Sequence, residues 1–433
     1  MMQEDKYNFS KLIIDQDKYQ SYTKKKNFIL DKQLEKLPKK IVFCKLCVGS
    51  NQRPRTEFDK DGVCNACRYA RDLKFAENGI DWNKRENELK KLLDKHRSKD
   101  GSWDCLVPSS HGKDSAIVAH QLKHKYGMHP LTITWAPFIY TSVGFKNYMD
   151  MTHKGFDGMV AWPNGITHRK LSRVGFELKG DSFEAFCYGQ KAYPFQIAVK
   201  FKIPLIFYGE NGEVEYGGSF KNVDKPHESP ADWEEEYYKG AGFDTVLEEG
   251  NKMGIISDEE LSDGCFDFYR APPLENVKKV GVQMHWWSYY KRWMPQENFY
   301  YASENTGFSP NYKRTDSTYT KFVSIDDRLD PYHWYLAYIK FGYGRATRDA
   351  CSDIRCGHIT REEGVALTHK YDAEFPATHF KDFLNYLDID ESYFHKIIDR
   401  YRLPHMWGKI EDKWKRKCVV SNSSLLGEIP KDE

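Results

Sequence analysis

The feature that most limits how this chain can fold is an alternation of short apolar segments and helical segments that begins near residue 102. The expected strands are WDCLVP (103–108), PLTITWA (130–136), DGMVAWP (157–163) and IPLIFYGE (203–210). Helical stretches lie between them, at about 115–126 and through QKAYPFQIAVKF. This alternation predicts an α/β fold, in which helices cover both faces of a mostly parallel sheet. Such sheets bind their ligands at the carboxyl ends of the strands.

Residues 109–115 form the loop after the first expected strand, and their composition predicts an anion site. The loop leads into a helix, so backbone N–H groups and the helix dipole favour an anion there. Ser110 and Ser115 add hydroxyl donors, Lys113 adds a positive charge, and Asp114 is a carboxylate that can hold Mg²⁺. The G-x4-G-K-[ST] spacing of a Walker A loop is absent. The alternative is a serine-rich strand–turn–helix that holds no ligand.

A histidine, His111, occupies a position where loops of this kind usually have a glycine. If the backbone there needs a positive φ, a histidine costs roughly 1 kcal/mol or more. If φ is negative, the imidazole can add a donor to the phosphate. We expect His111 to modify the loop rather than to disarm it, with a negative φ and a ring that points out of the cradle. Its contact with the anion would then be weak and pH-dependent.

A second polar group, YGENGEVEYGG (208–218), follows the fourth expected strand. Its three carboxylates, Glu210, Glu213 and Glu215, could hold Mg²⁺ or position a substrate at the same edge of the sheet. The alternative is an acidic turn. We expect Glu210, together with Lys113 and Asp114, to be catalytic.

Four cysteines in the N-terminal part have the spacing of a zinc ribbon, expected at 41–70. Cys44 and Cys47 form one C-x2-C pair, and Cys64 and Cys67 form a second pair sixteen residues later. Two such pairs complete a closed tetrahedral Zn²⁺ site, with a role in folding rather than catalysis. The alternatives are a redox pair or free thiols.

The C-terminal half is aromatic and mostly helical in pattern, and it contains weaker candidates. Arg345 and Arg348 could bind a substrate carboxylate or phosphate, or form surface ion pairs. His120 and His124, one helical turn apart, make half a metal site at best. Cys351 and Cys356 are expected to be buried thiols. Five aromatic side chains could stack on a sugar or a base, or form a helical core stripe: Tyr289, Tyr290, Trp293, Tyr300 and Tyr301.

Length and composition limit the organisation and the partners of the chain. With 433 residues and 40% hydrophobic content, two or three domains are expected. We place them at 1–97, 98–222 and 223–433, with an acidic linker or surface insertion at 224–263. The net charge of +2 argues against a nucleic-acid partner. No signal peptide or long apolar run is visible, so we expect a cytoplasmic protein without membrane contact.

The loop resembles the pyrophosphate loop S-G-G-x-D-S of the PP-loop ATPases, because Ser110, Gly112, Lys113, Asp114 and Ser115 follow that pattern. Together with further segments, it resembles the N-acetyl sugar amidotransferase family, whose members make acetamidino sugars for surface polysaccharides and flagellin glycans of the pseudaminic and legionaminic types. Those segments are RPRTEFDKDGVCNACR, YGMHPLTITWAP, IPLIFYGENGEVEYGG, MPQENFYYASENTGF and FGYGRATRDACSDIRCGHITREEG.

The resemblance implies a PP-loop fold that binds ATP and Mg²⁺ with residues 110–115, joined by Thr134 and Trp135 on the second strand. It implies that the carbonyl oxygen of an N-acetyl group on a sugar or nucleotide-sugar is adenylated, and that ammonia then displaces AMP to leave an acetamidine. A separate subunit of the glutaminase/cyclase type would supply the ammonia, since no cysteine here lies in a G-x-C-x-G setting. Two alternatives are a tRNA-thiolating PP-loop enzyme and a scaffold inactivated by His111.

Overall fold

The computed structural model describes residues 7–24, 28–228, 230, 233 and 237–421. The ends of the first and last expected domains, at 1–6 and 422–433, lie outside the described residues. In the described part, none of the helices combines the length and the apolarity needed to cross a bilayer.

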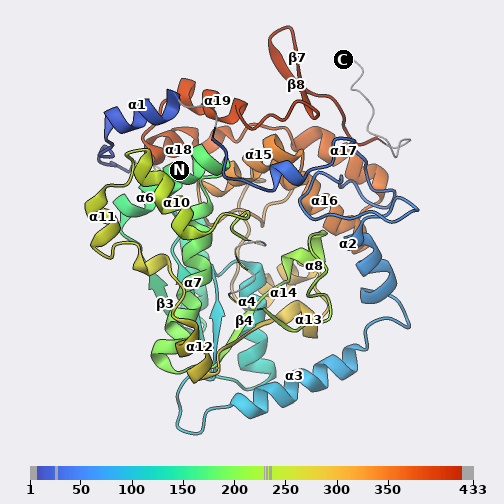
Figure 1. Ribbon diagram of the computed structural model, residues 1–433. Helices are drawn as coiled ribbons and strands as arrows, with labels where there is room; N and C mark the ends of the chain where they lie inside the picture. Colours follow the sequence, from blue (N-terminus) through green and yellow to red (C-terminus); the bar gives the residue numbers. More distant parts are fainter. Residues whose placement is uncertain (1–6, 25–27, 229, 231–232, 234–236, 422–433) are drawn as a thin grey trace.

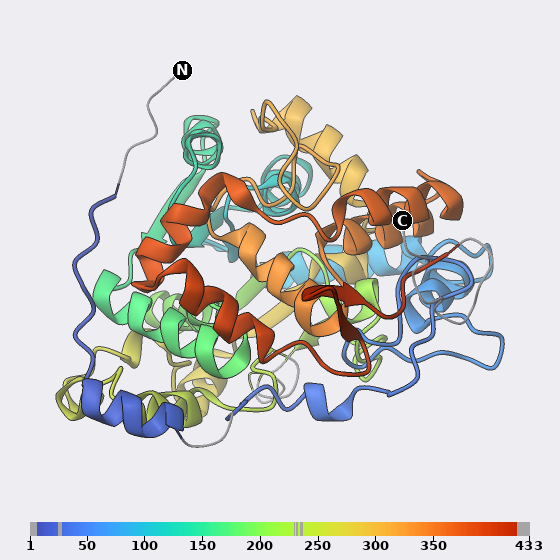
Figure 2. The same cartoon turned by 90° about the horizontal axis from the view of Figure 1, so that it is seen from above.

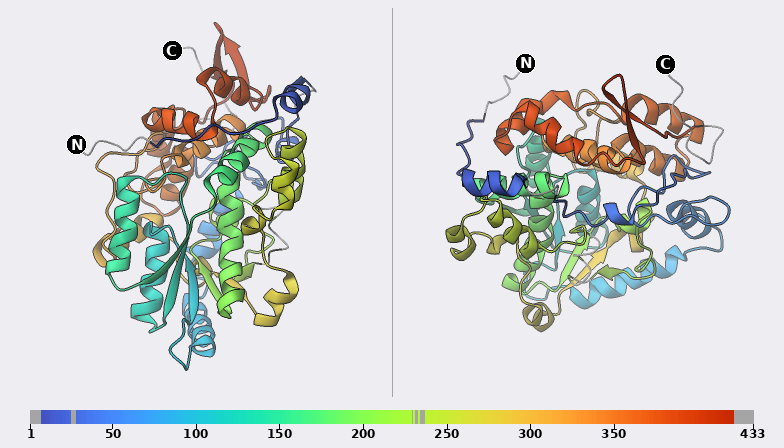
Figure 3. Two further views of the ribbon diagram at one scale, coloured as in Figure 1. Left: turned by 90° about the vertical axis from the view of Figure 1, so that its left-hand side faces the viewer. Right: turned by 45° about the horizontal axis from the view of Figure 1, so that its top comes forward.

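A six-stranded sheet, mostly parallel, forms the centre of the molecule. Its order is β3-β2-β1-β4-β6-β5, and only the short edge strand β5 runs antiparallel to its neighbour. Helices lie on both sides of the sheet (Figure 3, left). The predicted α/β class with a parallel sheet flanked by helices is therefore confirmed. The strands are β1 (Cys105–Pro108), β2 (Pro130–Trp135), β3 (Asp157–Ala161), β4 (Leu205–Tyr208), β5 (His227–Glu228) and β6 (Gln283–Trp286).

The strand order reverses between β1 and β4. From β1 the chain proceeds to β2 and β3 on one side, whereas from β4 it proceeds to β6 on the other side. The crossover connections diverge at such a point and leave a crevice at the carboxyl ends of the two strands, where ligands of open α/β sheets bind. The loops after β1 and β4 both begin at this crevice.

Alternation of side chains along the strands builds a separate core on each face of the sheet. Leu106 and Ile206 point to the face that α7 (Glu184–Phe201) covers, whereas Val107 and Phe207 point to the opposite face, under α4 (Lys113–His120). A third core joins the cysteine-rich segment, residues 41–70, to the C-terminal helices. The sheet is thus rigid from both sides, which fixes the loops at its edge.

The remaining helices surround the sheet (Figure 1), and those of the C-terminal part spread across the top of the molecule in orange and red (Figure 2). A two-stranded hairpin, β7 (Trp407–Ile410) and β8 (Lys413–Arg416), follows them. The bounds are α1 Gln16–Lys24, α2 Asn65–Arg68, α3 Trp82–His96, α5 Ser142–His153, α6 Gly165–Lys179, α8 Gly212–Tyr216, α10 Phe243–Lys252, α11 Asp258–Ser262, α12 Leu274–Val280, α13 Trp287–Tyr290, α14 Pro295–Asn305, α15 Asp330–Phe341, α16 Arg345–Arg355, α17 Arg361–Tyr371, α18 Phe380–Leu387 and α19 Glu391–Asp399.

Two segments beyond residue 222 differ from expectation. His285 and Trp286 belong to β6 instead of to a helix, so the sheet includes residues beyond 222, where we expected the second domain to end. The acidic segment 224–263 is more than a surface insertion, because α10 within it packs against α6 and buries Val246 and Leu247 in the core. Charged side chains on its outer face hid that apolar stripe.

Candidate functional site

The loop at 109–115 is held in place by a chain of hydrogen bonds among its own serines. The His111 N–H donates to Ser109 Oγ at 3.0 Å, Ser109 Oγ donates to Ser115 Oγ at 2.8 Å, and Ser115 Oγ donates to the Gly112 carbonyl at 3.2 Å. Gly112 is the N-cap of α4 and has no side chain to cap the first turn. The amide groups of that turn are thus left for a ligand, the arrangement in which helices bind anions.

The backbone of His111 has φ +60°, so the expected negative φ is wrong. The ring is also not exposed: its residue is 2% accessible, and the imidazole packs on Tyr148 with ring centroids 4.5 Å apart. Burial lowers the pKa of His111 to about 3, so the ring is neutral near pH 7 and the expected pH-dependent contact is wrong as well. The position suits glycine, and the packed ring offsets some of the backbone strain.

This burial predicts a pH-dependent stability. Below the ordinary pKa of 6.5 the unfolded chain takes up a proton at His111, whereas the folded chain resists uptake down to about pH 3. Stability from this group is therefore present above pH 6.5 and lost as the pH falls. Between pH 7 and pH 5, the free energy of unfolding should fall by about 2 kcal/mol more in the wild type than in His111→Asn. Asparagine is chosen because it tolerates φ > 0.

Urea unfolding at the two pH values measures this difference. The control is His153→Asn, a substitution at an exposed histidine at the end of α5, which should follow the wild type. An equal loss in wild type and His111→Asn would contradict the burial of an uncharged imidazole.

Two pockets lie on opposite sides of the loop. Ser110, Gly112 and Asp114 line both of them. The first pocket lies between the carboxyl ends of β1, β2 and β4, and it is lined by Pro108, Ser109, Ser115, Ile133, Trp135, Phe186, Gln190, Tyr193, Pro194, Tyr208, Gly209 and Glu210 as well. The second is lined additionally by His111, Lys113, Gly144, Asn147, Phe322, Val323, Ser324, Ile325, Asp326 and Arg345.

The first pocket has an aromatic wall and, beside it, a backbone carbonyl that a tyrosine hydroxyl caps. Trp135 lies against the backbone of α7 at Gly189, where a Cβ would stand 2.0 Å from the indole. Pro194 lacks the N–H that would bond to the Gln190 carbonyl within α7, and the Tyr208 hydroxyl donates to that carbonyl instead, at 2.8 Å. A flat ring with polar edges fits such a wall.

The residues predicted to bind the nucleotide are divided between the two pockets. Trp135 and Ser115 line the first pocket, and His111 and Lys113 line the second. Thr134 is absent from both linings, because its hydroxyl donates to the Ser109 carbonyl at 2.6 Å and holds the loop against β2.

Lys113 and Asp114 form an ion pair at the start of α4. Lys113 Nζ lies 2.5 Å from Asp114 Oδ2, and the lysine side chain is 5% exposed against 39% for the aspartate. The Asn298 amide on α14 donates to Asp114 Oδ1 at 3.1 Å. The carboxylate is therefore oriented by neighbours on both sides while it stays open to both pockets.

Glu210 lies just after β4, the neighbour of β1 at the place where the strand order reverses. Burial raises the pKa of Glu210, and the Asp114 carboxylate raises it further, while Arg348 and Lys113 act in the opposite direction. Tyr216 donates to Glu210 Oε1 at 3.1 Å, and Arg348 Nη2 lies 3.5 Å from the same oxygen. The Arg348 guanidinium also stacks on the Tyr216 ring, 3.9 Å from its centroid. Arg348 is thus a partly buried side chain whose charge lies between Glu210 and the Tyr216 ring.

The other two carboxylates of the YGENGEVEYGG segment do not line either pocket. Glu213 accepts two hydrogen bonds from Arg55, at 2.7 and 2.8 Å, and Glu215 pairs with buried Lys74 at 2.7 Å. In a short helix, α8, the direction of the side chain changes by about 100° per residue. Glu210, which precedes that helix, lines the first pocket, whereas Glu213 joins α8 to Arg55 in the segment 41–70 and Glu215 joins it to Lys74.

Four of the five aromatic candidates and the histidine pair pack within the molecule, whereas Tyr300 is 54% exposed. Trp293 and Tyr290 are buried in the core under α4, and Tyr301 donates to or accepts from His120 Nδ1 at 2.9 Å. His124 stacks on His120 with centroids 4.4 Å apart. None of the five lines either pocket: Tyr289, Tyr290, Trp293, Tyr300 and Tyr301.

Sequence reasoning missed Asp326, which lines the second pocket. Burial raises the pKa of Asp326 to about 6, and Asp330 raises it too, while a hydrogen bond from Ser110 and the charge of Arg345 lower it. The available signal was the acidic pair in SIDDRLDP, just before a helix that starts with Asp-Pro.

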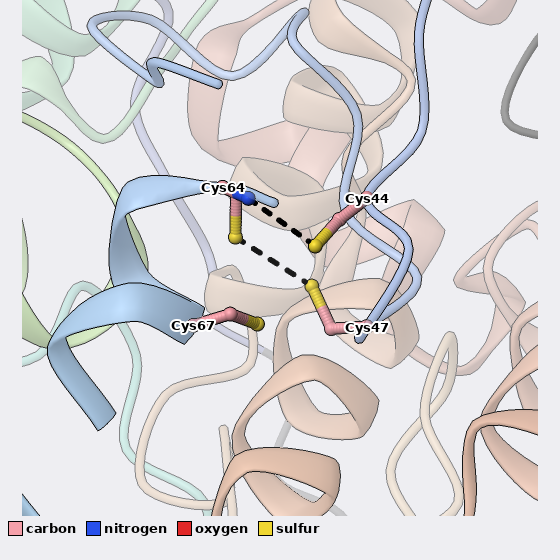
Figure 4. Close-up of side chains that lie close together, drawn as sticks. All are labelled: Cys44, Cys47, Cys64 and Cys67. Carbon is pink, nitrogen blue, oxygen red and sulfur yellow. Dashed lines mark hydrogen bonds between the residues drawn. The ribbon is translucent and has the colours of Figure 1, made fainter. Parts of the chain in front are cut away.

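The four cysteines of the two C-x2-C pairs converge as predicted (Figure 4). Their sulfur atoms all lie within 4.8 Å of one another, and all four residues are buried. The N–H of Cys64 and that of Leu46 each donate to Cys44 Sγ, at 3.3 and 3.4 Å. Thiolates oriented by backbone amides are the donor set that Zn²⁺ prefers, so this cluster can hold a structural zinc ion.

The C-terminal helices fasten this cluster to the rest of the molecule. Arg361, the first residue of α17, donates to the carbonyls of Cys47 at 3.2 Å and Cys44 at 3.3 Å. Cys351 on α16 is buried beside Cys47, as the space around Gly49 shows. The cysteine-rich segment and the C-terminal region therefore fold as neighbours.

Comparison with known families gives one match. Residues 316–419 match the model of the C-terminal domain of WbpG-like LPS biosynthesis proteins. No curated protein sequence matches the chain. The matched region contains Asp326 and Arg345, which line the second pocket, and Arg348, which lies beside Glu210. The match indicates a role in LPS or sugar biosynthesis.

Proposed function

We propose that this protein is a PP-loop enzyme that uses ATP and ammonia to convert the N-acetyl group of a sugar, free or nucleotide-linked, into an acetamidino group. The observation that carries the proposal is the loop at 109–115. It lies where the strand order reverses between β1 and β4, it leads into a helix without a side-chain cap, and it lines two pockets. The LPS-biosynthesis match supports the sugar substrate. We further propose that 1–97 and 223–433 complete the site around an ATP-binding domain at 98–222.

The two pockets suit the two ends of ATP. The first has the aromatic wall that a base needs, at Trp135 and Tyr193. The second has Lys113 and the first turn of α4, which suit a diphosphate. The α-phosphorus would then lie at the shared wall of Ser110, Gly112 and Asp114. Cleavage between the α and β phosphates follows from this placement, because the pyrophosphate has a pocket of its own.

The reaction balances in two steps. The carbonyl oxygen of the acetamido group attacks the α-phosphorus, the bond to the β-phosphate oxygen breaks, and pyrophosphate leaves. Ammonia then adds to the imidate carbon, AMP departs with the former carbonyl oxygen, and the amidine remains. Lys113 neutralises the departing pyrophosphate, and Glu210, whose pKa is raised by burial, accepts a proton from the attacking nitrogen. Asp114 would hold Mg²⁺, which screens the phosphate charge.

The partners follow from the same chemistry. Free ammonia is scarce in water near pH 7, so a separate glutaminase subunit would deliver it. A tRNA-thiolating reaction needs a working cysteine at the phosphates, and neither pocket lining contains one. We place the reaction in the cytoplasm, where ATP is available.

Exchange of labelled pyrophosphate into ATP, with a panel of UDP-linked 2-acetamido sugars, tests this function. We expect exchange that needs both Mg²⁺ and a sugar, in the wild type and, within about threefold, in His111→Gly, which keeps φ > 0 without strain. An inert wild type that His111→Gly activates would support the inactive-scaffold alternative. No exchange in either protein with any sugar would contradict the proposed reaction.

A further inference from the structure

The segment 322–327 lies against Thr141 and Gly144 at the start of α5, and its residues 322–326 line the second pocket together with the loop at 109–115. The Thr141 N–H donates to the Asp326 carbonyl at 3.1 Å, and the Thr141 hydroxyl donates to the Ile325 carbonyl. Gly144 lets the segment approach, since a Cβ there would stand 2.4 Å from Asp326 Cα. The backbone at Asp326 is therefore held against the start of α5.

Two adjacent aspartates in this segment have different surroundings. The Asp327 carboxylate binds the backbone: it accepts hydrogen bonds from the N–H groups of Phe138 at 2.6 Å and Leu329 at 2.8 Å. Asp326 instead lines the second pocket, and Asp114, from the loop at 109–115, lines the same pocket. Two carboxylates thus line one cavity of about 120 Å³.

The same cavity contains polar groups that have no partner within the described part of the chain. Both ring nitrogens of His111 are buried without a hydrogen bond, in a residue that is 2% exposed. The Ser324 hydroxyl is buried and unbonded too, and Ser324 has φ +51°. Unpaired buried polar groups and strained non-glycine residues together indicate a ligand.

The charges that line the cavity cancel. Lys113 and Arg345 are cations, and Asp114 and Asp326 are anions. A diphosphate that enters carries several negative charges, and the helix terminus supplies only about half a positive charge. The remaining charge needs a cation, and Mg²⁺ is typically held by one or two carboxylates plus substrate phosphates.

We propose that Asp326 and Asp114 together hold a divalent cation, Mg²⁺ in the cell, that binds with the diphosphate in the second pocket. This inference rests on the proposed function, and it assigns Asp326, a residue of the C-terminal region, to the ATP site.

Titration of Mn²⁺ in the presence of α,β-methylene-ATP, followed by EPR, tests the site without turnover. We expect Asp326→Asn to weaken Mn²⁺ binding by at least about tenfold. The matched control is Asp412→Asn, the same change at an exposed aspartate in the turn between β7 and β8, outside the pocket lining, which should bind Mn²⁺ like the wild type. Thermal unfolding of both variants confirms that each is folded.

The pattern of results separates the two proposals. If wild type and Asp326→Asn bind Mn²⁺ and the nucleotide equally well, the cation site is overturned while ATP binding stands. If calorimetry detects no α,β-methylene-ATP binding to the wild type with or without Mn²⁺, the proposed function falls and the cation site falls with it.

Discussion

Lys113→Ala is expected to abolish sugar-dependent ATP–pyrophosphate exchange without unfolding the protein, and Asp114→Ala is expected to do the same. Lys113 is nearly buried beside the loop, and its Nζ lies 2.5 Å from Asp114. Removal of either charge takes away stabilisation that matters mainly as pyrophosphate leaves. The expected cost is roughly 2–4 kcal/mol, or about 10²–10³ in rate.

The control for this pair is Lys91→Ala, which removes an exposed lysine from α3 far from the pockets. It should exchange at the wild-type rate, and all three variants should keep the circular dichroism spectrum of the wild type. Exchange at the wild-type rate in Lys113→Ala would remove the loop from the reaction.

Cys64→Ser is expected to lose the zinc ion and a large part of the stability of the fold. The four sulfur atoms lie within 4.8 Å of one another, so three thiolates and a hydroxyl make a poor substitute. Arg361 and Glu213 join the cysteine-rich segment to α17 and α8, so its unfolding should spread beyond 41–70. We expect the free energy of unfolding to fall by at least about 4 kcal/mol.

Zinc content by mass spectrometry and denaturant unfolding measure the two effects. Cys265→Ser is the matched control, because Cys265 is a partly exposed thiol outside the cluster. It should keep one zinc per chain and wild-type stability. Zinc-free wild-type protein, or a Cys64→Ser variant with unchanged zinc and stability, would contradict the structural zinc site.

The elements that sequence predicted well are those with strong local signals. The four strands at 103–108, 130–136, 157–163 and 203–210 are short apolar runs bounded by turn residues, and each is a strand of the sheet. The cysteine cluster followed from spacing alone, since two C-x2-C turns can meet in few ways.

The elements that it missed depend on tertiary contacts. The four residues of β6 include no β-branched side chain, and pairing with β4 and β5 makes them a strand. The positive φ of His111 is imposed by the turn between β1 and α4, which no local propensity of histidine reveals. Asp326 comes to the loop from more than 200 residues away in the chain, so no motif could place it there.

The central claim, adenylation of an amide oxygen, can be tested by following one oxygen atom. UDP-linked 2-acetamido sugars labelled with ¹⁸O in the acetyl carbonyl would be incubated with the protein, ATP, Mg²⁺ and ammonium, and the nucleotides analysed by mass spectrometry. The account predicts AMP that carries one ¹⁸O, formed together with an acetamidino sugar. Unlabelled AMP, or ADP and phosphate in its place, would contradict it.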